Sequence, residues 1–315
     1  MEKIFRDNRY KSILAMLCAL GWSLAYPLIK IGYQEFRIDG IDLGSKILFA
    51  GIRSFFAGVL VLVFCGCRKI KMEMQRKQDY LWLLLLAVVN TSLHYMFAYI
   101  GLGYNSSARS TILDSMSGFI LIMLSTLIFA DDNMTKNKLL GCILGIMGII
   151  SINLQPGVDF LENITFMGDG MILLNACCGA VGGLITRVVS KKMNMTQATG
   201  QSMMIGGAIM LMVGTVIGRK SVWNISGKGI LIMTCLVLIS AVCFGIYNEL
   251  LAYHPISKIA IYNALIPVLG VIFASLLLGE TLKWQYFIAV VMVACGIYMV
   301  NGMAGGTKTN LKPYK

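Results

Sequence analysis

Charged residues are scarce in this sequence. Asp, Glu, Lys and Arg make up 13% of its 315 residues, whereas hydrophobic residues make up 57%. A soluble globular protein has roughly 25% charged residues, and the mean hydropathy of this chain is +0.75. Such a chain cannot bury its apolar surface in water, so we expect an integral membrane protein. The apolar runs recur from Ser12 almost to the C-terminus and leave no stretch for a separate soluble domain.

The sequence also lacks the motifs that are typical of ATP binding, catalysis and metal binding. The sequence has no GxxxxGK[ST] phosphate-binding loop, so we expect no ATP-driven work by this chain. It has no HExxH or other clustered nucleophile, base or metal set, which argues against an enzyme and predicts no catalytic residues. Its nine cysteines are scattered, and the closest groupings, Cys65-Gly-Cys67 and Cys177-Cys178, have no His or Cys partners nearby. We therefore predict no metal site and no cofactor.

The net charge of +12 could suggest nucleic acid, but the Lys and Arg residues lie in short loops between apolar runs, so we predict no nucleic-acid partner. Alternate loops assigned to opposite sides place 18 basic residues on the side of the N-terminus and 6 on the other. The positive-inside rule then predicts a multi-pass protein of the inner or plasma membrane with both termini cytoplasmic. The loop from Arg219 to Lys228 fits this assignment least well.

A membrane-spanning helix needs about 20 largely apolar residues, and the chain offers ten runs close to that length. The runs are continuously apolar rather than alternating with period two, which predicts helices and not a barrel. The first run is too long for a signal peptide, so we expect an uncleaved helix. The predicted spans are approximately Ser12–Ile31, Lys46–Cys65, Tyr80–Ile100, Ala108–Phe129, Lys138–Leu154, Gly168–Ser190, Thr199–Ile217, Gly229–Ala252, Lys258–Leu278 and Trp284–Val300.

The two halves of the chain resemble each other. SARSTILDSMSGFILIMLSTLIFAD, which begins at Ser107, aligns with ISKIAIYNALIPVLGVIFASLLLGE, which begins at Ile256, at a constant offset of 149 residues. Five helices per repeat is an odd number, so the second half must cross the membrane in the opposite sense. We predict an all-α integral membrane fold of about ten transmembrane helices in two inverted five-helix repeats, residues 12–154 and 168–301. Secondary transporters use this plan, with the substrate site near the bilayer midplane between the halves.

Three further segments carry a family resemblance: LCALGWSLAYPLIKIG (Leu17–Gly32), GIRSFFAGVLVL with Arg53, and LLLGETLKWQYF (Leu276–Phe287). Together with the duplication they resemble the EamA-type branch of the drug/metabolite transporter superfamily, over nearly the entire chain. The resemblance implies a secondary transporter of small polar metabolites, for example an amino-acid or metabolite exporter, that works by alternating access.

The sequence departs from the family pattern in its first repeat. The usual Gly-Glu is replaced there by Ala130-Asp131, and Gly118 stands where a proline is expected, whereas the second repeat keeps Pro267 and Glu280. These changes are compatible with the fold but could alter how the first half bends.

Ionisable and polar residues inside the apolar runs are candidates for substrate binding, because a charge in the bilayer core costs at least a few kcal/mol. Asp114 or Glu249 could bind the amine of a substrate or a proton, or could instead pair with a basic neighbour near a helix end. His94 shares a helical stripe with Asn90 and could relay protons or be a hydrogen-bonded core residue. The full set of candidates is Asp114, His94, Asn90, Tyr26, Trp22, Asn175, Glu249 and Asn263.

Four residues are candidates for structural or gating roles: Arg53, Lys30, Pro267 and Glu280. Arg53 matches an arginine that recurs in the family; it could clamp a carboxylate or hold helices together. Lys30 is predicted near the outer mouth, where snorkelling to the interface is the simpler role. Pro267 interrupts helical hydrogen bonding and could serve as a hinge.

Two other functional classes compete with the carrier. One is a membrane receptor or partner that moves no solute, and the other is a membrane-embedded enzyme acting on a lipid. The expected partners of a carrier are a small-molecule substrate, the lipid bilayer and, as a further hypothesis, a coupling proton. The sequence predicts no particular oligomeric state.

Overall fold

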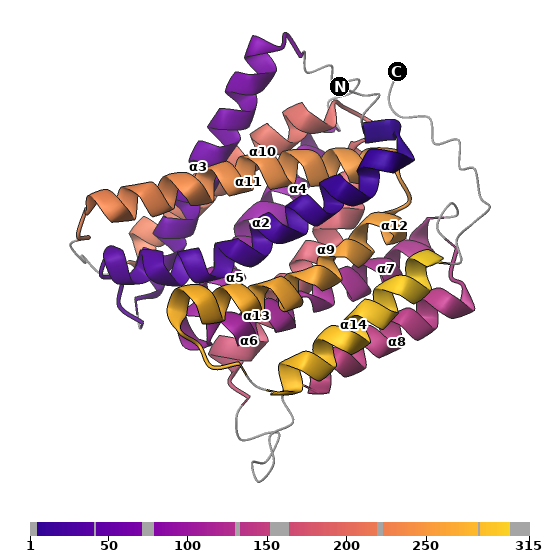
Figure 1. The fold of residues 1–315 in the computed structure, drawn as a ribbon. Coiled ribbons are helices and arrows are strands. Elements are labelled where there is room, and N and C mark those ends of the chain that lie inside the picture. Colours follow the sequence, from indigo (N-terminus) through magenta and orange to yellow (C-terminus); the bar gives the residue numbers. More distant parts are fainter. Residues whose placement is uncertain are drawn as a thin grey trace.

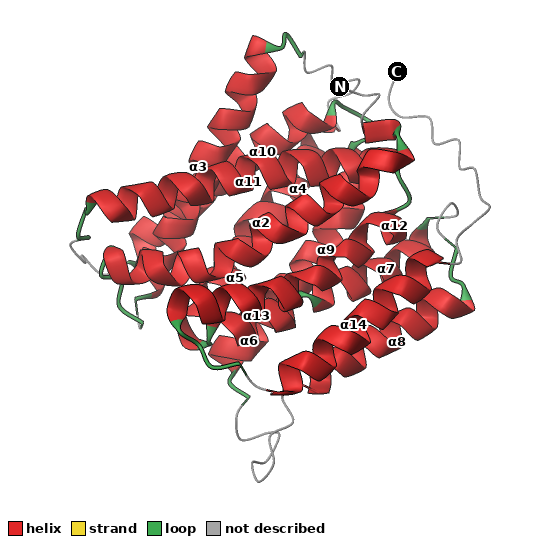
Figure 2. Cartoon of the chain, viewed as in Figure 1, coloured by secondary structure: helices red, strands yellow, loops and turns green. Residues whose placement is uncertain are grey.

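The computed structural model describes residues 5–40, 42–70, 79–129, 133–151, 164–218, 223–282 and 284–302. These residues form helices and turns and no strand (Figure 2). The elements are α2 (Asn8–Glu35), α3 (Leu43–Cys67), α4 (Asp79–Leu86), η1 (Ala87–Leu93), α5 (His94–Tyr104), α6 (Ser107–Asp114), α7 (Met116–Ile128), α8 (Lys136–Ser151), η2 (Phe166–Gly170), α9 (Met171–Val189), α10 (Met195–Ile217), α11 (Gly227–Tyr253), α12 (Ile256–Ala260), η3 (Ile261–Ala264), α13 (Leu265–Leu278) and α14 (Trp284–Gly302).

Eight helical stretches of the described chain are long and apolar enough to cross a bilayer, and each has at least 22 residues. The remaining two predicted spans correspond to α8 and α14, which pack side by side at one edge of the bundle (Figure 1). The predicted all-α integral membrane fold is therefore confirmed. Leu154, the predicted end of the first repeat, and Ala130-Asp131 lie outside the described residues.

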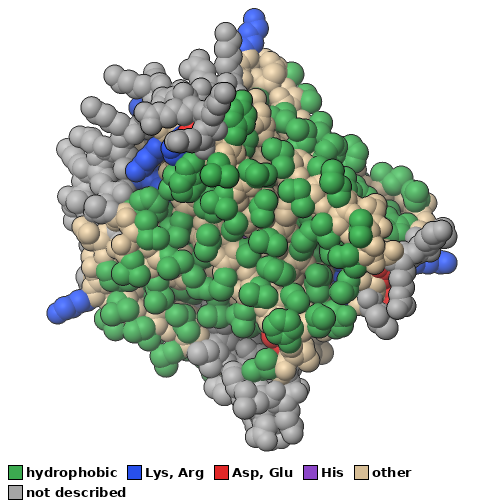
Figure 3. Space-filling model, turned by 180° about the vertical axis from the view of Figure 1, so that it is seen from behind, with side chains coloured by type: hydrophobic (Ala, Val, Ile, Leu, Met, Phe, Trp, Pro, Cys, Tyr) green, Lys and Arg blue, Asp and Glu red, His purple; other side chains and the backbone are tan. Residues whose placement is uncertain are grey.

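The surface of the bundle is apolar, as a protein in contact with lipid requires. Large side chains such as Leu127 and Val216 are 80% and 84% exposed. Seen from behind, the molecule presents a nearly continuous hydrophobic face, with Lys and Arg confined to its periphery (Figure 3). A patch of this extent on a soluble monomer would mark an interaction site; here the bilayer covers it.

Glycines spaced seven residues apart hold the two repeats together. A Cβ atom on Gly58 of α3 would lie 2.4 Å from the backbone nitrogen of Met204, and one on Gly207 of α10 would lie 2.4 Å from that of Phe55. The two backbones are thus in direct contact, and a seven-residue spacing keeps the small residues on one stripe. The stripe consists of Gly44, Gly51 and Gly58 on α3 and Gly200, Gly207 and Gly214 on α10.

The fourth and ninth spans are each broken near the middle. In the fourth span, α6 ends at Asp114 and α7 begins at Met116. In the ninth, α12 gives way to the short 3-10 helix η3 before α13, because Pro267 has no N–H to donate to the carbonyl of Asn263. Asp114 and Asn263 are equivalent under the offset of 149 residues, so equivalent positions stand at the two breaks.

The two broken spans cross where they are interrupted. A Cβ atom on Gly118 of α7 would lie 3.0 Å from the carbonyl oxygen of Ala260, and one on Gly270 of α13 would lie 2.7 Å from Thr111 of α6. Glycine at these positions allows the first-repeat helix to lie directly on its second-repeat counterpart. The crossing brings both breaks to the centre of the bundle.

We expect Gly58→Ala to lower the free energy of unfolding by about 1–3 kcal/mol, because the new methyl group has no room between α3 and α10. The matched control is Gly245→Ala in α11, where an added Cβ meets no atom within 4 Å. This variant should be neutral or slightly stabilising, since alanine is the better helix former. Thermal unfolding of both variants in detergent checks the expectation; equal stability would contradict the direct contact of α3 with α10.

Candidate functional site

A cavity of about 90 Å³ lies between the two repeats. One buried water needs roughly 10–15 Å³, so the space holds several waters or a small solute. Its walls come from α2, α3, η1, α5, α6 and α7 of the first half and from α9, α11, η3 and α13 of the second. Among the sequence-predicted residues, the structure places these in the wall: Trp22, Tyr26, Arg53, Asn90, His94, Asp114 and Asn263.

Asp114 contributes a carboxylate to the cavity. It is the last residue of α6 and is partly exposed there. Its Oδ1 accepts a hydrogen bond from Nδ2 of Asn175, and its carboxylate also accepts one from the hydroxyl of Tyr26. Asn175 itself is completely buried and is not among the residues lining the cavity. The structure therefore places Asn175, which was a predicted substrate-binding candidate, behind Asp114 on α9 rather than in the cavity wall.

His94 extends this hydrogen-bonded group. Its Nδ1 lies 3.1 Å from the carbonyl oxygen of Asn175. A carbonyl only accepts, so this contact assigns the proton to Nδ1 and leaves Nε2 of the neutral ring as an acceptor. His94 follows the π-helix η1, a local widening that is frequent at functional sites. The glycines at positions 179 and 182 of α9 leave space for the side chains of His94 and Asn90, since a Cβ atom on Gly182 would overlap the side chain of Asn90.

Arg53 ties three helices together at the cavity wall. The side chain is only 2% exposed. Its Nε donates to Oγ of Ser240 at 2.6 Å and to the carbonyl of Leu236 at 3.2 Å, both on α11. Its Nη1 donates to the hydroxyl of Tyr99 on α5 at 2.7 Å, and its guanidinium lies over the ring of Tyr95 at 5.2 Å. The guanidinium thus joins α3, α5 and α11 while it supplies positive charge to the wall.

The second repeat and α2 add amide and aromatic groups. Nδ2 of Asn263 donates to the hydroxyl of Tyr247 at 2.9 Å. The ring of Trp22 packs edge-to-face against Tyr247 and Phe244, at centroid distances of 4.9 and 5.3 Å. Within the described part of the chain, the indole N–H of Trp22 is a buried donor without a partner. Aromatic faces next to a carboxylate suit a ligand that carries an ammonium group.

Glu249 lies away from the cavity, toward the predicted cytoplasmic end. The hydroxyl of Thr196 donates to its Oε1. The adjacent end of α11 is capped by Arg187, a cation at a helix C-terminus. Its Nη1 donates to the carbonyls of Leu251, Ala252 and His254 at 2.6, 3.1 and 3.0 Å. This placement favours the structural alternative for Glu249 over contact with substrate.

His254, between α11 and α12, closes the same end against the N-terminal segment. Its Nε2 lies 2.7 Å from the carbonyl oxygen of Phe5. Burial lowers the pKa of this imidazole below its usual range, which the hydrogen bond to Phe5 only partly offsets. The ring is therefore neutral near pH 7 and donates through Nε2.

Three candidates for structural or gating roles remain: Pro267, Glu280 and Lys30. Pro267 lies next to the break in the ninth span and outside the cavity wall. Glu280 accepts hydrogen bonds from the backbone N–H groups of Ser107 and Ala108, at 2.9 and 3.0 Å, and so caps the N-terminus of α6. Lys30 interacts electrostatically with Glu280 from α2. The last two therefore lie together at the predicted outer end.

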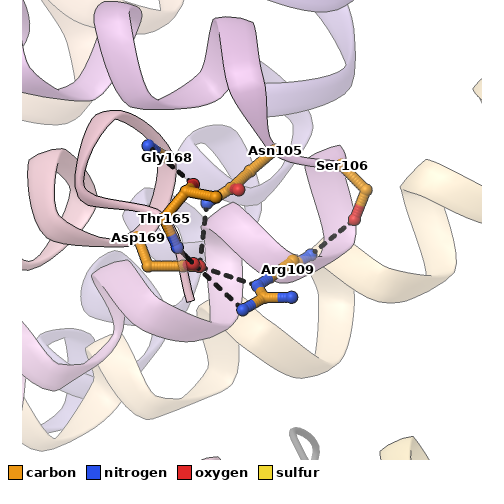
Figure 4. Close-up of polar contacts among 6 residues, drawn as sticks. All are labelled: Asn105, Ser106, Arg109, Thr165, Gly168 and Asp169. Atoms are coloured by element: carbon orange, nitrogen blue, oxygen red, sulfur yellow. Dashed lines mark hydrogen bonds and ion pairs between the residues drawn. The ribbon is translucent and has the colours of Figure 1, made fainter. Parts of the chain in front are cut away.

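Sequence reasoning missed Asp169, which binds Arg109 at the same end (Figure 4). Asp169 is the second residue of the sixth predicted span, Gly168–Ser190, and is not among the predicted candidates. Arg109, at the start of the fourth predicted span, is not among the candidates either. The inverted plan places both starts at the same face, and this signal could have paired the two charges.

Comparisons with known proteins fit this geometry. The model of the EamA-like transporter family matches residues 10–154 and 166–302. The chain is 26% identical over 298 residues to an uncharacterized transporter of Synechocystis, with 89% of each chain covered. It is 22% identical over 303 residues to a protein of Escherichia coli named a probable amino-acid metabolite efflux pump, with 93% of this chain and 95% of that one covered. A solved structure at 11% identity has a TM-score of 0.73, covers 96% of this chain and shares its fold.

We expect Arg53→Lys to destabilise the protein, because the single nitrogen of an ammonium cannot take the places of both Nε and Nη1. Each lost hydrogen bond to a charged group is worth about 1.5–3 kcal/mol, so the loss should be in this range or above. Thermal unfolding in detergent measures it. Arg9→Lys, on an exposed side chain of α2, is the control and should leave the unfolding temperature unchanged. Equal behaviour of the two variants would mean that Arg53 joins no helices.

Proposed function

The chain belongs to the EamA-like transporter family, and from this premise we propose that it carries small polar metabolites across a membrane by alternating access. It is a multi-pass membrane protein. The observation that carries the proposal is the central cavity with Asp114 in its wall, between two halves of opposite orientation. Inverted-repeat carriers bind substrate at such a place.

We further propose the repeat boundaries 12–154 and 168–301 and a location in the inner or plasma membrane with both termini in the cytoplasm. The two matches to the family model support the boundaries. The excess of basic residues on one side supports the orientation.

The substrate class that suits the cavity best is a small solute with an ammonium group, such as an amino acid or a related metabolite. Asp114 supplies a carboxylate for the ammonium, and the rings of Trp22 and Tyr247 supply apolar faces beside it. Arg53 and the free indole N–H of Trp22 are donors for a carboxylate on the same solute. The name of the Escherichia coli relative points in the same direction.

A proton is the coupling ion that the site favours. Asp114 and His94, two titratable side chains of the cavity wall, are both held by Asn175, the first through its side-chain amide and the second through its backbone carbonyl. A carboxylate that holds either a proton or an ammonium can exchange one for the other. With no phosphate-binding loop in the sequence, a gradient of an ion or of another solute is the energy source.

Two other classes compete with this function. A receptor would bind solute in the same cavity without moving it. A lipid-acting enzyme would need a nucleophile or metal set open to the bilayer, whereas Asp114 and His94 face an interior cavity. The names of the relatives, transporters and an efflux pump, favour the carrier over both.

In proteoliposomes, counterflow with a panel of labelled amino acids and metabolites should reveal one transported class. Asp114→Asn should reduce this transport by about 10- to 100-fold, the value of one hydrogen bond to a charged group. Glu249→Gln is the matched control outside the cavity and should retain transport. Normal transport by Asp114→Asn would contradict a role of Asp114 in substrate binding. Solute binding without counterflow would favour the receptor function.

An imposed pH gradient tests the coupling separately. In the native protein the gradient should drive accumulation of the transported solute against its own gradient. Asp114→Asn cannot release a proton, so any transport it retains should be indifferent to the gradient. Native transport that does not respond to the pH gradient would contradict proton coupling without contradicting the carrier function.

A further inference from the structure

Helix α6 is fastened to the second repeat by two carboxylates at its N-terminal end. We define the clamp as Arg109, Asp169 and Glu280. Arg109 lies in the first turn of α6, Asp169 in η2 and Glu280 in the connection between α13 and α14. Both carboxylates therefore come from the second half of the chain and hold a helix of the first.

Asp169 is the more deeply buried of the two carboxylates, at 3% exposure. Its oxygens accept hydrogen bonds from Nε and Nη2 of Arg109 at 2.7 and 3.0 Å, a bidentate pair (Figure 4). They also accept from Nδ2 of Asn105 at 3.1 Å and from the backbone N–H of Thr165 at 2.9 Å. Without Arg109 this buried charge would keep only its neutral donors, so the pair matters more than an exposed ion pair does.

Glu280 fastens the same end through the backbone. The first N–H groups of a helix have no partner within the helix. Oε1 and Oε2 of Glu280 accept from Ser107 and Ala108, the first two residues of α6. A movement of α6 away from the second repeat would break these bonds together with the Arg109–Asp169 pair.

The same short helix carries Asp114 at its other end. Eight residues of α-helix span about 12 Å, so α6 is a rigid connection between the clamp and the cavity. The α-helical hydrogen bonding is interrupted at Ser115, whose backbone stays in the helical region, so a bend between α6 and α7 would occur there. Asp114 also binds Asn175 of α9, which continues from the η2 segment that carries Asp169. Thus α6 is attached to one second-repeat helix at both of its ends.

We propose that α6 is the gate of the cavity at this end, held shut by the clamp and released when a cationic solute replaces Asn175 as the partner of Asp114. This proposal rests on the alternating access proposed above. A ligand opens a gate only if it binds the open and closed states differently. The Asp114–Asn175 bond supplies that difference, because a solute that takes over Asp114 removes one of the two attachments between α6 and the η2–α9 helix.

Thiol accessibility tests the gate without knowledge of the substrate. Ser117 lines the cavity on α7, and Ser117→Cys places a nearly isosteric thiol there. A membrane-impermeant thiol reagent is applied to intact cells and, separately, to inside-out vesicles. The unmodified chain, with its nine native cysteines, gives the background. Added to Ser117→Cys, Arg109→Gln should raise the rate of labelling from the face that carries the clamp by about tenfold or more.

The matched control is Lys192→Gln. It breaks the ion pair between Lys192 and Asp79, 3.3 Å long, at the opposite end of the bundle, and should not raise labelling from the clamp face. Arg109→Lys keeps the charge but not the bidentate geometry, so its labelling rate should lie between those of the native residue and Arg109→Gln. Asp169→Asn, which keeps the shape of the side chain, repeats the test if Arg109→Gln folds poorly.

Three outcomes would overturn the gate. They are unchanged labelling from the clamp face in both Arg109→Gln and Asp169→Asn, a rise only from the other face, and an equal rise in Lys192→Gln. The result is separable from that of the counterflow experiment. If the native protein transports a solute but the clamp variants are labelled at the native rate, the gate is contradicted and the carrier function stands. If no solute on the panel is transported but labelling of the clamp variants rises, the gate stands and the proposed solute class is contradicted.

Discussion

Lipid offers no hydrogen-bond partner, so a charged group inside this bundle is stable only with partners from the protein. Arg53 meets this requirement with three bonds to two other helices, and Asp169 with donors from Arg109, Asn105 and Thr165. Each such set joins segments that are far apart in sequence. The same constraint that makes buried charges costly therefore also decides which helices are fastened together.

Close backbone contact complements these polar attachments. At the α3–α10 stripe, Gly58 and Gly207 let the backbones of the two repeats touch directly. The crossing of the broken spans instead combines small residues with polar ones, since Asp114 and Asn263 stand at the breaks. Backbone groups freed at a break are tolerated in a membrane only where they face protein or a cavity. The breaks and the cavity thus occupy the same place for one physical reason.

Apolar runs and the offset between the halves were enough to predict the helices and their inverted arrangement, because bilayer thickness fixes helix length. The scarcity of charge inside the runs likewise pointed to Asp114. Sequence could not place Asn175, since polar residues on the two faces of one helix look alike until their neighbours are known. Pro267 indicated the break in the ninth span, but Ser115, at the break in the fourth, is an ordinary helical residue there. Asp169 was missed because its importance lies in a partner 60 residues away.

The two ends of the bundle are not electrostatically equivalent, although the repeats relate them. Lys258 holds the position in α12 that Arg109 holds in α6. Arg109 meets the buried carboxylate of Asp169, whereas Lys258 experiences the like charge of Lys11 on α2. At these two equivalent positions the charges therefore attract at one end and repel at the other. In the gate that we propose, the attraction between Arg109 and Asp169 is the interaction that a solute bound to Asp114 has to overcome.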